Sequence, residues 1–158
     1  MATIVSVSPG APFTPKVNFP RSNNLQAAGA GNANMERPDL APGVVTSNIV
    51  RGGPDQYFDR TAFVLQPEGF LGNNGRNTLI GPGIATVDLS VTRNIPLKEQ
   101  YQIQFRGEFF NILNRVNFGL PNWQIFTNAT GTPNPSAGRI TNTSTPSRQM
   151  QFALKLLF

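Results

Sequence analysis

The sequence predicts an all-β protein of antiparallel strands joined by long irregular loops. Apolar and polar residues alternate with period two over residues 85–92, 101–109 and 149–158, which is typical of strands with one apolar and one polar face. The 158 residues include 15 Gly and 14 Pro, so turns and loops are expected to occupy much of the chain. No run of about 18 apolar residues occurs, which argues against a transmembrane helix.

The composition argues against catalysis and metal binding. The chain contains no cysteine and no histidine, so it lacks disulfides, thiolate metal ligands and the usual general base. Asp88 and Glu108 would need a cleft and shifted pKa values to act as an acid and a base, and the sequence indicates neither. We therefore predict no catalytic residue, no metal site and no cofactor, and we expect that the protein is not an enzyme.

The charge of the chain does not indicate a nucleic-acid partner. Charged residues make up 13% of the sequence, about half of the usual share in a soluble domain. The formal net charge is +5, but the arginines are scattered along the chain and form no basic stripe. We therefore expect no nucleic-acid binding.

The last twelve residues, SRQMQFALKLLF (147–158), carry the clearest alternation. Burying each apolar side chain of this stripe is worth roughly 1.5–3 kcal/mol, so the stripe needs an apolar phase or core worth on the order of 10 kcal/mol. The apolar positions are Met150, Phe152, Leu154, Leu156 and Phe158, and the polar positions between them include Gln149, Gln151 and Lys155.

Two earlier segments repeat this design. Residues 85–92 place Asp88 on the polar face, and residues 93–100 form a short polar connection to the next strand. Residues 111–114 break the alternation of that strand, which indicates a bulge or a rim. The polar face of the second segment carries Gln102, Gln104, Arg106 and Glu108.

The remaining residues have little periodicity. A short β-prone run, residues 3–7, is closed by Ser8-Pro9-Gly10, and a long region follows from residue 11 to about residue 83. Its low-complexity stretch QAAGAGNAN (26–34) is expected to be mobile. A structureless loop of this length argues against one compact domain.

Two features of the loops have both a functional and a structural interpretation. Trp123 and Phe126, in the loop from about residue 116 to 146, could bind a ligand, but packing within the loop is favoured. The glycines of GNNGRN (72–77) and GPG (81–83) lack the Lys-Ser/Thr of a phosphate-binding loop, so we interpret them as turn residues.

Strands of this design occur in soluble sandwiches and in outer-membrane barrels. In a sandwich the apolar faces meet in a core, whereas in a barrel they contact lipid and the polar faces line a wet lumen. Strand lengths near ten residues, and one short connection between long loops, favour the barrel. A pair such as Arg106 and Glu108 is also tolerable in a wet lumen and costly in a dry core.

Five pieces of the sequence resemble a known family. They are RPDLAPG (37–43), QYFDRTAFVLQPEGFLGNNGRNTLIGPG (56–83), ATVDLSVTRNIPL (85–97), QFRGEFFNILNRVNFGLPN (104–122) and GRITNTSTPSRQMQFALKLLF (138–158). In this order and spacing they are similar to the C-terminal end of the TonB-dependent receptor barrel, in its Oar-like, carboxypeptidase-regulatory type abundant in acidobacteria. SVSPGAPFTP (6–15) is similar to the end of the preceding strand in that family.

The resemblance implies an incomplete barrel. The family's barrel has about twenty-two strands, and residues 1–158 would hold the last four. The implied strands are about 2–14, 84–95, 100–112 and 147–158; loops 15–83 and 117–146 would face outside, and 94–100 would face the periplasm.

It also implies roles for the two strand faces. The terminal stripe of Met150, Phe152, Leu154, Leu156 and Phe158 looks like the signal that the barrel assembly machinery reads. Residues of the opposite face would line the lumen: Asp88, Gln102, Gln104, Arg106, Glu108, Gln149, Gln151 and Lys155.

The implied function is energy-coupled uptake of a siderophore, cobalamin, glycan or peptide across the cell outer membrane. The implied partners are outer-membrane lipid, the assembly machinery, the remaining barrel and plug, and the TonB complex. The plug, the energy-coupling box and a signal peptide are not found in this sequence, so we expect a truncated reading frame with Met1 as an internal start, which does not transport alone. The alternative is a small soluble or secreted β-domain that binds a ligand through its long loops.

Overall fold

The computed structural model describes residues 1–22, 36–98 and 101–158. Its strands form antiparallel sheets, which confirms the predicted all-β class with long irregular loops. No helix in the described residues is long and apolar enough to cross a membrane. The low-complexity stretch 26–34 lies outside the described residues, and so does the end of the predicted connection, residues 99–100.

The chain divides into two compact units, each made of separate segments. A sheet unit contains Met1–Pro9, Gly83–Phe118 and Thr143–Phe158. A loop unit contains Gly10–Pro82 and Gly119–Asn142. The sequence argued against one compact domain, and the structure has two units, of which the loop unit contains most of the aperiodic residues.

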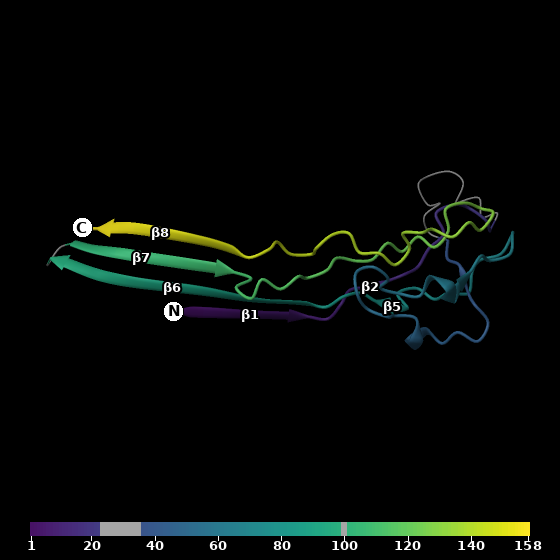
Figure 1. Cartoon of the computed structure of the whole chain (residues 1–158), viewed down its shortest axis with the longest axis horizontal. Helices are drawn as coiled ribbons and strands as arrows, with labels where there is room; N and C mark the ends of the chain where they lie inside the picture. The colour runs from purple at the N-terminus through teal and green to yellow at the C-terminus, as the bar shows by residue number, and fades with distance from the viewer. Residues whose placement is uncertain (23–35, 99–100) are drawn as a thin grey trace. The chain divides into compact units, whose positions relative to one another are not determined.

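The sheet unit is a four-stranded antiparallel sheet in the order β1-β6-β7-β8, seen as neighbouring arrows of alternating direction in Figure 1. In this order β1 and β8 are the edges, and among the described residues they are not paired with each other. The strands are β1 (Ala2–Ser8), β6 (Ile84–Lys98), β7 (Tyr101–Phe110) and β8 (Gln149–Leu157).

β8 is slightly shorter than the predicted range 147–158, and the ends of the other three strands differ from the predicted ranges for local reasons. β1 ends at Ser8 rather than near residue 14, since Pro9 and Gly10 follow it and Pro12–Phe13 form a separate strand, β2. β6 continues to Lys98 rather than 95, because Asn94 pairs with Gln104 and the register shift falls only between Pro96 and Lys98. β7 ends at Phe110 rather than 112, because Asn111 takes a positive φ of 49°.

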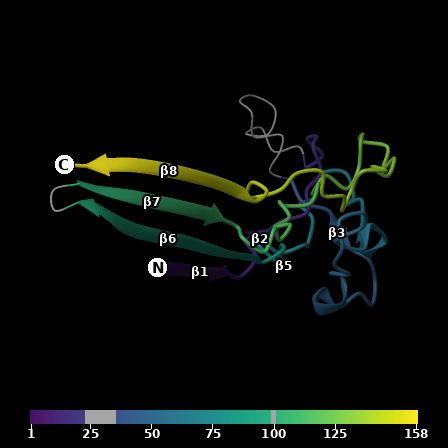
Figure 2. The ribbon, with the colours of Figure 1, turned by 60° about the vertical axis from the view of Figure 1, so that its left-hand side comes forward.

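The loop unit is held by very short strand pairs. β2 (Pro12–Phe13) pairs with β5 (Leu79–Ile80), and β3 (Asp39–Leu40) pairs with β4 (Phe63–Val64). Strands β2 and β5 are labelled in Figure 1, and β3 is labelled in Figure 2. Two 3-10 turns, η2 (Thr46–Asn48) and η3 (Arg60–Ala62), lie between β3 and β4. These pairs are too small to stabilise a fold by themselves.

An aromatic cluster supplies the core of the loop unit. Phe58 is fully buried, with its ring centroid 5.8 Å from that of Phe13 and 6.0 Å from that of Phe63 in an edge-on arrangement. Leu79 and Ile125 are also buried. These residues come from both segments of the unit, so the core joins segments that are distant in sequence.

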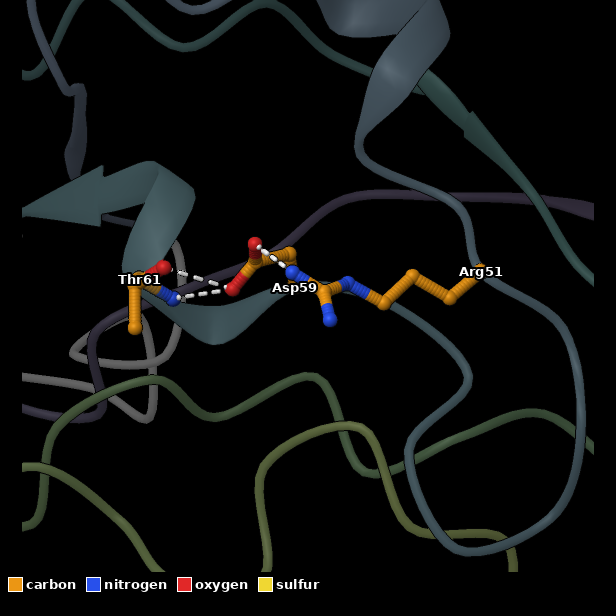
Figure 3. Close-up of polar contacts among 3 residues, drawn as sticks. All are labelled: Arg51, Asp59 and Thr61. Carbon is orange, nitrogen blue, oxygen red and sulfur yellow. Dashed lines mark hydrogen bonds and ion pairs between the residues drawn. The ribbon is translucent and has the colours of Figure 1, made fainter.

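A short polar motif starts the η3 turn. The Asp59 carboxylate accepts hydrogen bonds from the Thr61 amide (2.9 Å) and the Thr61 hydroxyl (2.6 Å), and it pairs with the Arg51 guanidinium (Figure 3). The hydrogen bond from the Thr61 side chain is the main cause that lowers the pKa of Asp59 below its usual value, and Arg51 acts in the same direction. The carboxylate therefore caps the turn in its ionised form.

The glycines of the two predicted turn motifs allow close backbone approaches. A Cβ atom on Gly72 would lie 1.9 Å from the Arg37 carbonyl oxygen, and one on Gly81 would lie 2.6 Å from a Leu120 methyl carbon. The backbone contact excludes a side chain at Gly72, whereas at Gly81 the Leu120 side chain would have to move. Close backbone packing therefore accounts for the glycine at position 72.

Candidate functional site

The candidate functional site is the pair of faces of the four-stranded sheet. Residues directly opposite each other in an antiparallel pair lie on the same face. Leu89 is opposite Phe109, which is opposite Met150, and Val91 is opposite Gly107, which is opposite Phe152. The register therefore joins the predicted apolar stripes into continuous rows across β6, β7 and β8.

The terminal stripe is largely uncovered in the described structure. Leu154 is 73% exposed, Phe158 is 93% exposed, and Met150, Phe152 and Leu156 are each more than half exposed. Phe158 follows the end of β8. An apolar row of this size facing water is unfavourable, so another apolar phase is expected to contact it.

Aromatic packing gives the centre of the apolar face a defined shape. The Phe152 ring lies over Gly107, since a Cβ atom on Gly107 would be 3.4 Å from two of its ring carbons. Its centroid is 6.1 Å from that of Phe105 in a stacked pair and 5.8 Å from that of Phe109 in an edge-on pair. Gly107 is consequently the buried position of β7.

Three of the predicted lumen residues form one cluster on the other face. Glu108 accepts hydrogen bonds from both the Arg106 guanidinium and the Gln151 amide. Arg106 remains about half exposed, which suits a charged pair in contact with water. The cluster lines a shallow hollow of about 310 Å³ on this face.

The other predicted lumen residues are distributed along the same face. Gln104 donates to the Asn94 side chain at 3.0 Å, a partner that sequence reasoning missed because it placed Asn94 in a connection. Gln104 is opposite Lys155 in the register. Alternation puts Gln102 and Gln149 on this face as well.

The Asp88 carboxylate has a hydrogen-bond partner within the structure. Its Oδ1 accepts a hydrogen bond from the Asn111 amide at 2.8 Å, where β7 ends. The break predicted at residues 111–114 is therefore a turn anchored to β6, and Asn114 also has a positive φ of 49°. Asparagine tolerates this conformation better than most residues, which explains its use twice in this turn.

Asn117 connects the ends of the sheet beyond this turn. Its side chain accepts from the Ala85 amide at 2.9 Å and donates to the Ala85 carbonyl at 3.1 Å and to the Thr145 hydroxyl at 2.9 Å. Because Asn117 is almost fully buried, these bonds are not shared with bulk water. The motif was missed because a single Asn in a loop has no periodic signal.

No cluster of three or more metal-binding side chains exists in the part of the chain that the structure describes. Of the two loop aromatics, Phe126 is buried, whereas Trp123 is 43% exposed.

Comparison with known families decides between the two architectures. The family model of an outer membrane beta barrel domain matches residues 1–151. The chain belongs to this family. Searches of curated proteins and of solved structures returned no match.

Family membership assigns an environment to each face of the sheet. An outer-membrane barrel domain presents its apolar face to lipid and its polar face to the lumen. The chain is therefore an outer-membrane protein, and the soluble sandwich is not supported.

Proposed function

We propose that these four strands form part of the wall of a TonB-dependent transporter, which takes up a substrate across the outer membrane. The observation that carries the proposal is a two-faced sheet whose edges, β1 and β8, are not paired with each other within residues 1–22, 36–98 and 101–158. The smallest outer-membrane barrels have eight strands, so four strands need others to close. The family resemblance of the sequence pieces supports a receptor barrel of the transporter type.

The connections between strands support the same proposal. β6 and β7 are joined by residues 99–100, whereas the connections β1–β6 and β7–β8 hold the whole loop unit. In an antiparallel sheet these two long connections leave from the same end. Short turns on one side and long loops on the other are typical of outer-membrane barrels, with the long loops outside the cell.

The proposed role is structural and not enzymatic. The polar face would line the lumen, with the Arg106–Glu108–Gln151 cluster in contact with water. Lipid, the rest of the barrel, a plug and the energy-coupling TonB complex would be its partners.

The assembly machinery is a further proposed partner, through Met150, Phe152, Leu154, Leu156 and Phe158. Replacing Phe158 with Asp should lower crosslinking of the chain to that machinery, compared with Arg148→Asp as a control outside the stripe. Equal crosslinking of the two variants would contradict a role of the stripe in binding the assembly machinery.

The solution behaviour of the purified chain tests whether its four strands form only part of a barrel. We expect the chain to aggregate in plain buffer and to disperse in detergent micelles, because its edges and apolar face are both uncovered. Analytical ultracentrifugation with and without detergent measures this. A soluble monomer that unfolds cooperatively in plain buffer would contradict the proposal.

The transport part of the proposal has a separate test. Sequencing the gene region and its transcripts should reveal a plug domain and an energy-coupling box encoded upstream of the barrel. Their absence from every transcript would reject TonB-dependent transport while leaving the barrel assignment intact.

A further inference from the structure

The loop unit contains a hollow of about 660 Å³ between residues 120–123 and 136–142. This volume lies within the range of small-molecule sites, roughly 300–1,000 Å³. Its lining includes Leu120, Asn122, Trp123, Ser136, Arg139 and Asn142.

Backbone hydrogen bonds hold the two walls of the hollow together. The Asn122 amide donates to the Arg139 carbonyl at 2.8 Å, and the Gly138 amide donates to the Asn122 carbonyl at the same distance. At one end the Gly119 amide donates to the Asn142 carbonyl at 2.9 Å. Ala137 and Ile140 are buried beside this ladder, so the hollow is preformed and a ligand need not order it.

The charged side chain among the lining residues is positive, and the same arginine, Arg139, also lines the neighbouring hollow that contains Asp55. Arg139 is exposed and takes part in neither of the two ion pairs found among the described residues. The Lys16 ammonium lies 5.9 Å from the centroid of the Trp123 ring. Since no acidic side chain is among the lining residues, the hollow favours an anionic group.

Neutral donors and one flat apolar surface complete the lining. Trp123 is 43% exposed and offers part of its indole surface. The Asn122 Oδ1 accepts from the Gln124 amide at 3.1 Å, so its side-chain NH₂ is oriented as a donor. Asn142 and Ser136 add an amide and a hydroxyl group.

We propose that this hollow binds an acidic sugar of the hexuronate class. The carboxylate would form a two-pronged ion pair with Arg139, a geometry that the planar guanidinium favours. The C–H face of the sugar ring would stack on Trp123, because the face of an aromatic ring is electron-rich. Ring hydroxyls would bond to Asn122 and Asn142.

A simple aromatic acid fits the lining less well. It would satisfy Arg139 and Trp123 but offers no hydroxyl groups to the amides and the serine. The proposal goes beyond the transporter role, since a preformed loop site binds its ligand whether or not the barrel transports it.

The single tryptophan of the chain makes the site directly observable. With the purified full chain in detergent micelles, galacturonate should change the Trp123 emission saturably, whereas galactose at equal concentration should not. Arg139→Gln should weaken galacturonate binding about tenfold or more, as expected for loss of a charged hydrogen-bonding partner. Arg76→Gln, an exposed arginine elsewhere in the loop unit, should leave binding unchanged.

Near-UV circular dichroism of each sample verifies that the aromatic core is folded. Arg139→Lys tests whether a positive charge without the planar guanidinium group is enough for binding. In folded wild-type protein, no saturable response to galacturonate would overturn the proposal. Equal responses to galacturonate and galactose, or binding of benzoate in place of galacturonate, would also overturn it. So would an Arg76→Gln effect as large as that of Arg139→Gln.

Discussion

The two units place their apolar residues in opposite environments. Every buried hydrophobic residue among the described residues, from Phe13 to Ile140, belongs to the loop unit. The sheet unit instead leaves Phe152, Leu154 and Leu156 largely exposed. The loop unit therefore contains its own core, whereas the described sheet residues leave their apolar side chains uncovered.

The largest expected effect comes from a substitution that disrupts only the core of the loop unit. Phe58→Ala should destabilise that unit by about 3–5 kcal/mol, because it removes a fully buried ring between Phe13 and Phe63. Denaturant titration of the chain in micelles, followed by Trp123 emission, measures the change. Phe70→Ala is the matched control, since Phe70 is 67% exposed and should change little. Equal losses for both variants would contradict a core centred on Phe58.

A pair of neighbouring substitutions tests the two faces of the sheet. Val91→Arg puts a charge on the apolar face, which we propose contacts lipid, and should cost about 2–4 kcal/mol if that face is fully covered by an apolar phase. Ser90→Arg puts the same charge on the polar face opposite Glu108, where water and a carboxylate are available.

The measurement is the stability of each variant in detergent micelles, from urea titration. The difference between the two variants isolates the face, since the residues are adjacent on β6. A larger cost for Ser90→Arg than for Val91→Arg would reverse the assignment of the faces.

The smallest expected effect concerns the Asp59 cap of the loop unit. Its pKa is lowered in the folded state, so its contribution is present above the unfolded value of about 3.9 and is lost as the pH falls through the lower folded value. Asp59→Asn keeps an oxygen that can cap the turn but removes the charge that pairs with Arg51, so it should cost about 0.2–1 kcal/mol at neutral pH and flatten this acid-dependent loss.

Unfolding of the loop unit measured between about pH 6 and pH 2 checks the expectation. Asp55→Asn, which changes an exposed carboxylate in the same loop, is the control. If the loss with falling pH is as steep in Asp59→Asn as in the wild type, the cap is not its source.

The sequence predicted the sheet better than the loops because only the strands show a periodic alternation of apolar and polar residues. Strict alternation located β6, β7 and β8, and register then aligned their faces. It could not find the far end of β6, since Asn94 and Pro96 look like loop residues until their partners on β7 are known.

The loop unit had no comparable signal. Its core combines Phe13, the pair Tyr57-Phe58 and the pair Ile125-Phe126, which are far apart in the sequence and follow no period. The hollow beside Trp123 and Arg139 depends in the same way on two loop segments meeting. Contacts of this kind follow from tertiary packing and are invisible to local patterns.

The division of the loop unit into Gly10–Pro82 and Gly119–Asn142 has a consequence for the order of biogenesis. The Arg21 guanidinium reaches the Ala129 carbonyl across 108 residues of sequence, and the Ile125 amide bonds to the Lys16 carbonyl. The unit therefore cannot be completed until residues beyond β7 have been synthesised, and contacts of such sequence separation form slowly. A nascent chain that ends before residue 119 should hold only the first segment of the loop unit, with the apolar surface that Ile125 covers still exposed.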